Sequence, residues 1–455
     1  MKKELIWQYV IGLLLCGGVL IVLFFSPAGQ KSLLLPDGSV HGHPWNGGDT
    51  MTYVKPAEAF LHTGTFARGG QPDMHRTIGY PLFLALTMYF FGNYWVPAAY
   101  LLQLTVFALL FPASSYIANS LFPHIGKKKS RLIVFLLAAS GVGLAYTGQL
   151  MTDQFFTSLL TAGIACGFFA VRNASWKMAM MHILLVGYAA QVRPTLGLFF
   201  LSDCFFLIYV VSMWKLEFTR KRRLIIAMSM IVLAVAGNGP AIRNYFNHGV
   251  FTATDVLSDN FAKYLAGPVM MKEGRGEEFE KMQKTFKQLQ GRDRIEAREK
   301  FAFSVYQQYP LTTLNRMLYH AFWNLFEPHW EYILNVYETG FSLNSFYDHN
   351  RKIKKNIFFG VPFFFYYILC YGAFFYSIIH TLKRKHTLFL LFGLFFYMLP
   401  FAASFINGAG ARMRLYVEPI LIAIACNIFF NLIGDHRNKN EVAVVPCHDR
   451  STPVP

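Results

Sequence analysis

The chain has 455 residues, 54% of them hydrophobic and 17% aromatic, and its mean hydropathy is +0.34. A chain this apolar is neither a soluble globule nor a disordered segment. The net charge of +17 could indicate a nucleic-acid partner, but the Lys and Arg residues form short clusters between apolar runs, as in the cytoplasmic loops of membrane proteins. We therefore expect no nucleic-acid partner. The cysteines lie mostly inside apolar runs and form neither a disulfide framework nor a zinc pattern.

The first apolar run covers residues 9–25, close to the roughly 20 residues that a helix needs to cross a bilayer. Lys2 and Lys3 precede it, which places the N-terminus in the cytoplasm, and we expect this span to be retained rather than cleaved as a signal peptide. The loop that follows, 26–94, then lies outside the membrane. Its apolar run at 79–92 is too short to cross, so we expect an interfacial helix there.

The later apolar runs alternate with basic clusters. If 79–92 does not cross, every short basic cluster falls on the cytoplasmic side. The chain is thus predicted to be an all-α polytopic membrane protein with about ten transmembrane helices. The expected later spans are 95–117, 132–150, 155–171, 178–190, 196–214, 224–241, 356–382, 388–405 and 415–433.

This topology divides the chain into four parts. They are an N-terminal transmembrane module (1–242) that includes the outer loop 26–94, an extracytoplasmic region (243–355), C-terminal transmembrane helices (356–440) and a disordered cytoplasmic tail (441–455). In the extracytoplasmic region, apolar residues of 277–309 recur at helical spacing among charged ones. This pattern predicts amphipathic helices on the outer surface.

Ionisable residues gather at the outer ends of the expected spans, where their cost makes them candidate functional residues. Carboxylates beside several guanidinium groups suit a reaction with a phosphate leaving group. One Arg side chain can donate two parallel hydrogen bonds to phosphate oxygens, and a carboxylate can accept the proton of an attacking hydroxyl. These residues are Asp49, Asp73, His75, Arg76, Asp153, Arg193, Arg243, Arg412, Arg414 and Glu418.

Each of these residues also has a structural explanation. Asp49 and Asp153 stand where helices are expected to begin, so either could be only a helix cap. Arg193 lies at an outer membrane boundary, where a snorkelling Arg is ordinary. One His beside Asp73 is a weak metal signal.

Several segments, taken in order, resemble the GT-C superfamily of integral membrane glycosyltransferases, among them the protein O-mannosyltransferases and aminoarabinose transferases. In the first outer loop, Asp49 and Tyr53 are followed by HTGTF (62–66) and HRTIGYPLFLAL (75–86). The segment YTGQLMTDQFFTSLL (146–160), which contains Asp153, is similar to the second acidic motif of the family. Later matching blocks are QVRPTLGLF (191–199), GPAIRNYFNHGVF (239–251) and GARMRLYVEPIL (410–421).

The resemblance implies the GT-C fold, with interfacial helices and a catalytic carboxylate in the first outer loop. It implies inverting transfer of a hexose or pentose from a polyprenyl-phosphate donor to a glycolipid, glycan or protein acceptor on the extracytoplasmic side. No nucleotide cofactor is expected. A divalent metal ion stays open, because the sequence has no ligand set of convincing spacing. Among membranes, a bacterial inner membrane fits best.

The resemblance and the reaction chemistry together assign roles. Asp49 is expected to be the general base or orienting acceptor, and Asp153 to bind the sugar or acceptor, or to hold a metal or water beside Asp49. Tyr53, His75 and Tyr80 are expected to line the substrate. The candidate ligands of the donor phosphate are Arg76, Arg193, Arg243, Arg412 and Arg414, with Arg193 and one of the last two favoured.

Two other functions stay open. A secondary transporter or flippase of lipid-linked sugars also has ten to twelve spans, but it usually shows repeated halves and broken helices near the midplane. An O-antigen ligase or polymerase would keep its catalytic groups in a late outer loop, so that the loss of Asp49 would matter little.

Overall fold

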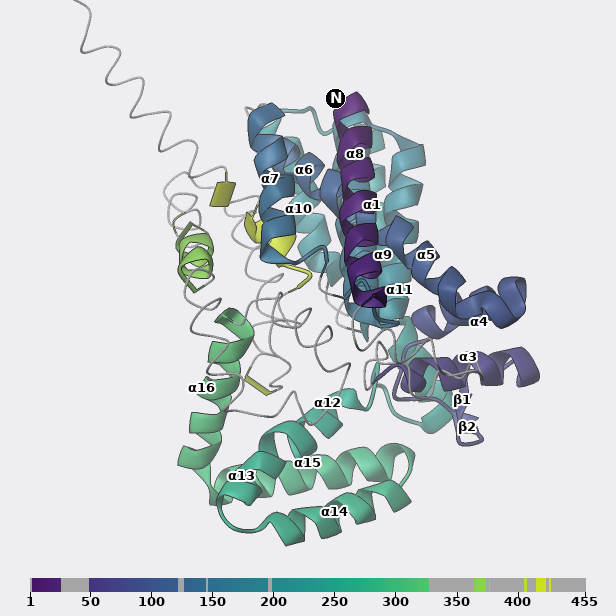
Figure 1. Ribbon diagram of the computed structural model, residues 1–455, viewed down its shortest axis with the longest axis vertical. Coiled ribbons are helices and arrows are strands. Elements are labelled where there is room, and N and C mark those ends of the chain that lie inside the picture. Colours follow the sequence, from purple (N-terminus) through teal and green to yellow (C-terminus); the bar gives the residue numbers. More distant parts are fainter. Residues whose placement is uncertain are drawn as a thin grey trace, which may run out of the picture.

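A computed structural model of the chain describes residues 2–25, 49–121, 127–144, 146–194, 199–326, 364–373, 376, 405–406, 415–422 and 425–426. Within these ranges the protein is almost entirely α-helical (Figure 1). The expected span 388–405 lies almost entirely outside the described residues, the span 415–433 is described only at 415–422 and 425–426, and the tail 441–455 lies wholly outside them.

A bundle of long helices forms the larger part of the described fold (Figure 1). Its central helix is α8, which packs against α5, α6, α9, α10 and α11. In its most apolar 18-residue window, 89% of α8 is buried inside the protein, against 17% of α1, so α1 is the peripheral helix with a lipid-facing surface. The bundle helices are α1 (Lys2–Phe24), α5 (Trp95–Ala108), α6 (Leu110–Leu121), α7 (Lys127–Ser140), α8 (Thr152–Asn173), α9 (Trp176–Val192), α10 (Phe199–Met213) and α11 (Arg220–His248).

Four helical stretches among the described residues are long and apolar enough to cross a membrane: Lys3–Phe24, Gly79–Ser120, Thr152–Asn173 and Arg220–His248. Shorter apolar helices are also present, and one of them, Phe364–Ala373, lies in the expected span 356–382. The bundle therefore has the hydrophobic lengths of an integral membrane protein.

The prediction of a span over 132–150 is wrong in its second half. Helix α7 ends at Ser140, and the described residues from Gly141 to Leu150 form turns. Glycines explain the close packing of these turns. A Cβ atom on Gly143 would lie 2.7 Å from the ring of Phe111, and one on Gly148 would lie 2.5 Å from the side chain of Leu23.

The basic clusters meet at one end of the bundle, as the charge analysis predicts. Arg131 pairs with Glu4 at 3.0 Å, which joins the starts of α7 and α1. Arg222, at the start of α11, donates to the carbonyl of Arg172 at 3.2 Å, and Arg172 lies over the ring of Trp214. The described basic residues at the starts of α7 and α11 and at the end of α8 thus share one end of the bundle with the start of α1.

The first outer loop lies at the opposite end. It contains α3 (Met51–Thr63), a hairpin of β1 (Ala67–Arg68) and β2 (Gln71–Pro72), α4 (Gly79–Phe91) and a short 3-10 turn (Gly92–Tyr94). Figure 1 shows α3 and α4 lying across the bundle axis, as expected of interfacial helices. The hairpin turns at Gly69 and Gly70, whose φ angles of 64° and 80° suit a type I′ turn.

Helix α4 docks closely on the bundle at its first residue. The Tyr188 hydroxyl donates to the carbonyl of Gly79 at 2.9 Å. A Cβ atom on Gly79 would lie 2.5 Å from the carbonyl carbon of Gln191, so only glycine allows this approach. The contact fixes the start of α4 beside the C-terminal end of α9.

A group of helices after α11 forms an outer module at the same end as α3 (Figure 1). It has its own small apolar core of Ala266, Val269, Met270, Phe279, Ala302 and Val305. The helices predicted in 277–309 are present as α14 and α15, whereas the sequence analysis did not anticipate α16. The module consists of α12 (Val256–Asp259), a π-helix (Asn260–Ala266), α13 (Gly267–Lys272), α14 (Gly276–Gln288), α15 (Gly291–Gln308) and α16 (Pro310–Phe326).

Inside the bundle, His182 of α9 and Asp203 of α10 form a fully buried pair. The His182 Nε2 atom lies 3.0 Å from Asp203 Oδ2, and its Nδ1 atom lies 2.8 Å from the carbonyl oxygen of Gly163 in α8. The pair therefore ties three bundle helices together, away from the outer end.

Candidate active site

The carboxylate of Asp49 lies just before α3 and forms an ion pair with Arg76. Arg76 Nη2 is 2.9 Å from Asp49 Oδ1, and Arg76 Nε donates to the Thr52 hydroxyl at 2.8 Å. The N-cap of α3 is Thr50, whose side chain makes no cap hydrogen bond, and the Asp49 carboxylate binds Arg76. The Asp49 side chain is 36% exposed, so a substrate hydroxyl can reach it.

The second carboxylate, Asp153, lies in the first turn of α8 and is fully buried. Its Oδ1 atom pairs with Nη1 of Arg193, which caps the C-terminal end of α9. As at Asp49, the carboxylate binds a guanidinium; the N-cap of α8 is Met151. The side chain of Arg193 is 17% exposed, so the pair reaches the surface on the arginine side.

Tyr53 of α3 joins the two pairs. Its ring lies under the Arg76 guanidinium, 4.5 Å from ring centroid to Cζ, and its hydroxyl lies 3.2 Å from that of Thr152. Burial raises the pKa of the Tyr53 hydroxyl, Arg76 lowers it, and the charges of Asp49 and Asp153 raise it. Arg76, which binds Asp49, lies over the Tyr53 ring, and Thr152, the neighbour of Asp153, lies at the Tyr53 hydroxyl, so the two pairs meet at one tyrosine at this end of the bundle.

Part of the late sequence block also reaches this point. Tyr416 packs edge-on against Phe156, one turn along α8 from Asp153, with ring centroids 5.6 Å apart. The described part of the block, residues 415–421, thus packs beside the first turns of α8. Arg412 and Arg414 themselves lie outside the described residues.

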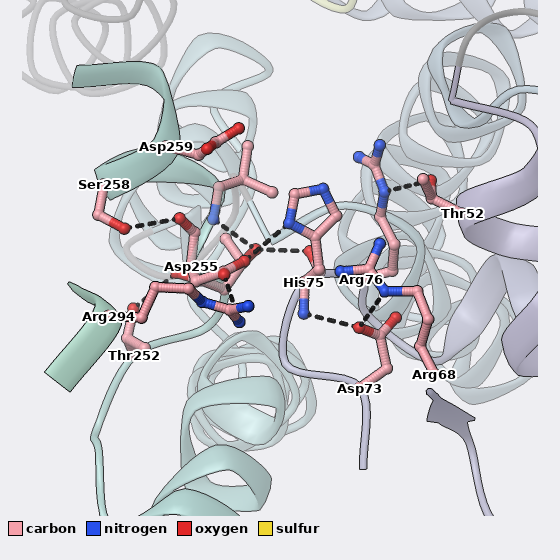
Figure 2. Close-up of polar contacts among 12 residues, drawn as sticks. Thr52, Arg68, Asp73, His75, Arg76, Thr252, Asp255, Ser258, Asp259 and Arg294 are labelled. Atoms are coloured by element: carbon pink, nitrogen blue, oxygen red, sulfur yellow. Dashed lines mark hydrogen bonds and ion pairs between the residues drawn. The ribbon is translucent and has the colours of Figure 1, made fainter. Parts of the chain in front are cut away.

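The turn that carries Arg76 is held from the bundle and from the outer module. Arg243, near the end of α11, donates through Nη2 to the carbonyls of Asp73 and Arg76 at 2.9 and 3.2 Å. His75 directs its imidazole to Asp255, with Nδ1 and Oδ1 2.7 Å apart (Figure 2). Arg243 and His75 therefore support this turn in the structure, and the phosphate-binding and substrate-lining roles expected from the sequence stay predictions.

Tyr80, which the sequence predicts to line the substrate, packs inside the protein. It is fully buried, its hydroxyl donates to Gln103, and its ring packs against that of Tyr53 with centroids 5.2 Å apart. These contacts support the position of Tyr53, and the substrate-lining role stays a prediction. Gln103 in turn donates to the carbonyl of Gln149 at 3.2 Å, so this contact joins α4, α5 and the start of α8.

A divalent metal ion has no ready group of three ligands among the described residues. Within the described ranges, no group of three or more His, Cys, Asp or Glu side chains is arranged to hold one. Asp49 and Asp153, the two expected carboxylates, each bind an arginine instead. The charges that balance these carboxylates are therefore guanidinium groups.

Sequence reasoning missed Asp255, Arg294 and Arg298, although they form the densest charge cluster of the outer end. Asp255 follows the block 239–251, and the arginines lie in the amphipathic stretch, where they read as ordinary solvent-facing charges. No local signal pairs residues so far apart in the sequence.

These features define a class of protein: an α-helical membrane protein of the GT-C fold, with paired carboxylates and arginines at one end of its helical bundle. No known family model and no curated protein sequence matches the chain. Among solved structures, it is similar to the apo oligosaccharyltransferase of Archaeoglobus fulgidus, with a TM-score of 0.51 and 10% identity over 98% of this chain and 53% of that one.

The chain is also similar to the Archaeoglobus fulgidus oligosaccharyltransferase AglB in complex with an inhibitory peptide and a dolichol-phosphate. The TM-score is 0.50 and the identity 12%, over 99% of this chain and 53% of that one. Our chain thus spans about half the length of these two structures. At these identities the likeness is one of fold, and it confirms the helical GT-C architecture expected from the sequence.

Proposed function

We propose that the protein is a glycosyltransferase that moves a sugar from a polyprenyl-phosphate donor to an acceptor hydroxyl on the extracytoplasmic side of the membrane. The observation that carries this proposal is the pair of arginine-bound carboxylates, Asp49 and Asp153, around Tyr53 at the outer end of a GT-C bundle. The dolichol-phosphate in one of the similar structures supports a lipid-linked donor.

In the proposed reaction, the acceptor oxygen attacks the anomeric carbon from the face opposite the phosphate. The new carbon–oxygen bond forms as the bond from carbon to phosphate oxygen breaks, with inversion at the anomeric carbon. The hydroxyl proton passes to Asp49, and the electron pair of the broken bond leaves with the lipid phosphate. Asp49 suits this role because it is partly exposed and Arg76 fixes its orientation.

Arg193 is the arginine that we favour for the leaving phosphate. It uses Nη1 for Asp153, and the other N–H groups of its partly exposed guanidinium are the proposed donors to phosphate oxygens. Asp153 would orient Arg193 and bind the sugar or acceptor beside it. Arg412 and Arg414 stay proposed phosphate ligands, because both precede Tyr416 closely in the sequence.

The acceptor is proposed to be a glycolipid, a glycan or a protein, and the sugar a hexose or pentose. The partly exposed site lies at the end opposite the basic clusters, which supports an extracytoplasmic active site in a bacterial inner membrane. Catalysis is proposed to use guanidinium groups for charge balance, with no nucleotide cofactor.

The test is transfer of radiolabelled sugar from a panel of polyprenyl-phosphate sugars, in membranes that contain the wild-type chain or Asp49→Asn. We expect transfer by the wild type and a loss of at least 100-fold, about 10²-fold being the low end for a general base, in the variant. The matched control is Asp293→Asn, an exposed carboxylate of α15, which should keep full activity. Unchanged transfer in Asp49→Asn would favour a ligase with a late catalytic loop, and no transfer from any donor would favour a transporter.

A further inference from the structure

Asp255 is a buried carboxylate at which a histidine and two arginine side chains meet. It lies at the start of α12 and is 1% exposed. Its Oδ1 atom is 2.7 Å from His75 Nδ1, and its Oδ2 atom is 2.9 Å from Arg294 Nη2 and 3.1 Å from Arg298 Nη1. Figure 2 labels Asp255, His75 and Arg294. Buried carboxylates with several partners are costly to disturb, so this cluster fixes the relative positions of the groups that it joins.

These three basic side chains come from two different parts of the protein. His75 belongs to the first outer loop, whereas Arg294 and Arg298 lie one turn apart on α15. Arg298 also binds Asp259, at the other end of α12, at 2.9 Å, so α12 is held along α15. Asp255 therefore links the outer module to the first outer loop.

The outer module also forms hydrogen bonds with the backbone of the turn that precedes Arg76. The Thr254 hydroxyl donates to the carbonyl of His75 at 2.7 Å, and the amide of Asp255 approaches the carbonyl of Met74 at 3.4 Å. Arg76 follows directly, and its guanidinium is the partner of Asp49. The position of this guanidinium thus depends on a turn that is clamped from 180 residues further along the chain.

We propose that Asp255 is a positioning residue for the transfer reaction: by holding His75 it fixes the turn at residues 73–76 and keeps Arg76 on Asp49. The outer module thereby sets the activity of the first outer loop without touching the reacting atoms. The catalytic part of this inference rests on the proposed function, whereas the clamp itself does not.

The kinetic test uses Asp255→Asn, which keeps the shape of the side chain and removes its charge. A displacement of about 1 Å costs about 10²-fold in rate, so we expect kcat to fall between about 10- and 100-fold while the KM for the donor changes little. His75→Gln is the second variant, because it leaves both arginines on Asp255 and so preserves the outer module. The matched control is Arg292→Gln, which breaks an exposed ion pair with Glu296 on α15 and should change neither constant.

A double-mutant cycle separates positioning from a general loss of structure. If Asp255 acts through Arg76, Asp255→Asn should reduce kcat less than about 2-fold further in an Arg76→Gln background, because the group that it positions is gone. Effects that multiply would overturn the proposal. So would a full wild-type kcat in both Asp255→Asn and His75→Gln.

Amide hydrogen exchange tests the clamp without any transfer reaction. Peptides that cover residues 73–79 should exchange faster in Asp255→Asn and His75→Gln than in the wild type, with no change in Arg292→Gln. Unchanged exchange in this segment would overturn the clamp even if transfer fell. Faster exchange in the variants, together with no sugar transfer by the wild-type chain, would support the clamp. The same result would overturn both the proposed function and the catalytic part of this inference.

Discussion

Removal of Arg193 should destabilise the protein through the carboxylate that it leaves behind. Asp153 is fully buried, and its Oδ1 atom forms an ion pair with Arg193. Breaking a buried ion pair on one side costs about 3–5 kcal/mol, because the remaining buried charge loses that counter-charge. Asp153 lies in the first turn of α8, where the helix dipole favours a negative charge by roughly 1 kcal/mol. The expected net loss for Arg193→Gln is therefore about 2–4 kcal/mol.

The assay is thermal unfolding of the purified protein in detergent, for Arg193→Gln, Asp153→Asn and the double variant. The double variant removes both charges, so it should unfold at a higher temperature than Arg193→Gln alone. Arg292→Gln, which breaks an exposed pair, should unfold like the wild type. A wild-type unfolding temperature for Arg193→Gln, or a double variant no more stable than Arg193→Gln, would refute the assignment of a buried charge pair.

Two further predictions concern the first outer loop and its clamp. Gly79→Ala should destabilise the protein by about 1–3 kcal/mol and reduce transfer, because the added Cβ atom would lie 2.5 Å from the backbone carbonyl carbon of Gln191. Gly187→Ala, whose Cβ would lie 3.5 Å from that of Ala236, is the control, and equal unfolding temperatures for the two variants would contradict the close contact. Burial raises the pKa of Asp255, but His75, Arg294 and Arg298 outweigh it and leave the pKa below its usual value. The ionised carboxylate thus stabilises the folded protein above about pH 4 and loses this effect as the pH falls towards its lowered pKa. The gap in unfolding temperature between the wild type and Asp255→Asn should therefore narrow between pH 6 and pH 3, and a constant gap would contradict the charge cluster.

The helices of the bundle could be predicted from the sequence because each depends on local information. Apolar length and basic flanks gave the approximate positions of α8 and α11, and the short run at 79–92 indicated α4. The early end of α7 could not be predicted. The turns from Gly141 pack against Phe111 and Leu23, which are distant in sequence, and hydropathy alone does not distinguish buried turns from a buried helix.

The candidate site could be predicted only in part. Asp49 and Asp153 were identified as carboxylates, but their arginine partners are contacts across 27 and 40 residues that no spacing rule specifies. Tyr80 matches the expected motif and yet is buried, because the packing of α4 against α5 and α8 decides which side of that helix meets the substrate. The contacts of His75 with the outer module and of Arg243 with the turn at 73–76 are tertiary contacts, which the sequence alone does not reveal.

The buried pair of His182 and Asp203 has a consequence for the biogenesis of the protein. An aspartate deep within an inserting helix opposes membrane integration by up to about 3 kcal/mol, and α10 carries Asp203 among apolar neighbours. Its partner is on α9, the helix synthesised immediately before it. If the two helices leave the translocon as one hairpin, the carboxylate meets its imidazole before either is exposed to lipid. Cotranslational assembly of this hairpin would then be the step at which α9 and α10 become committed to the bilayer.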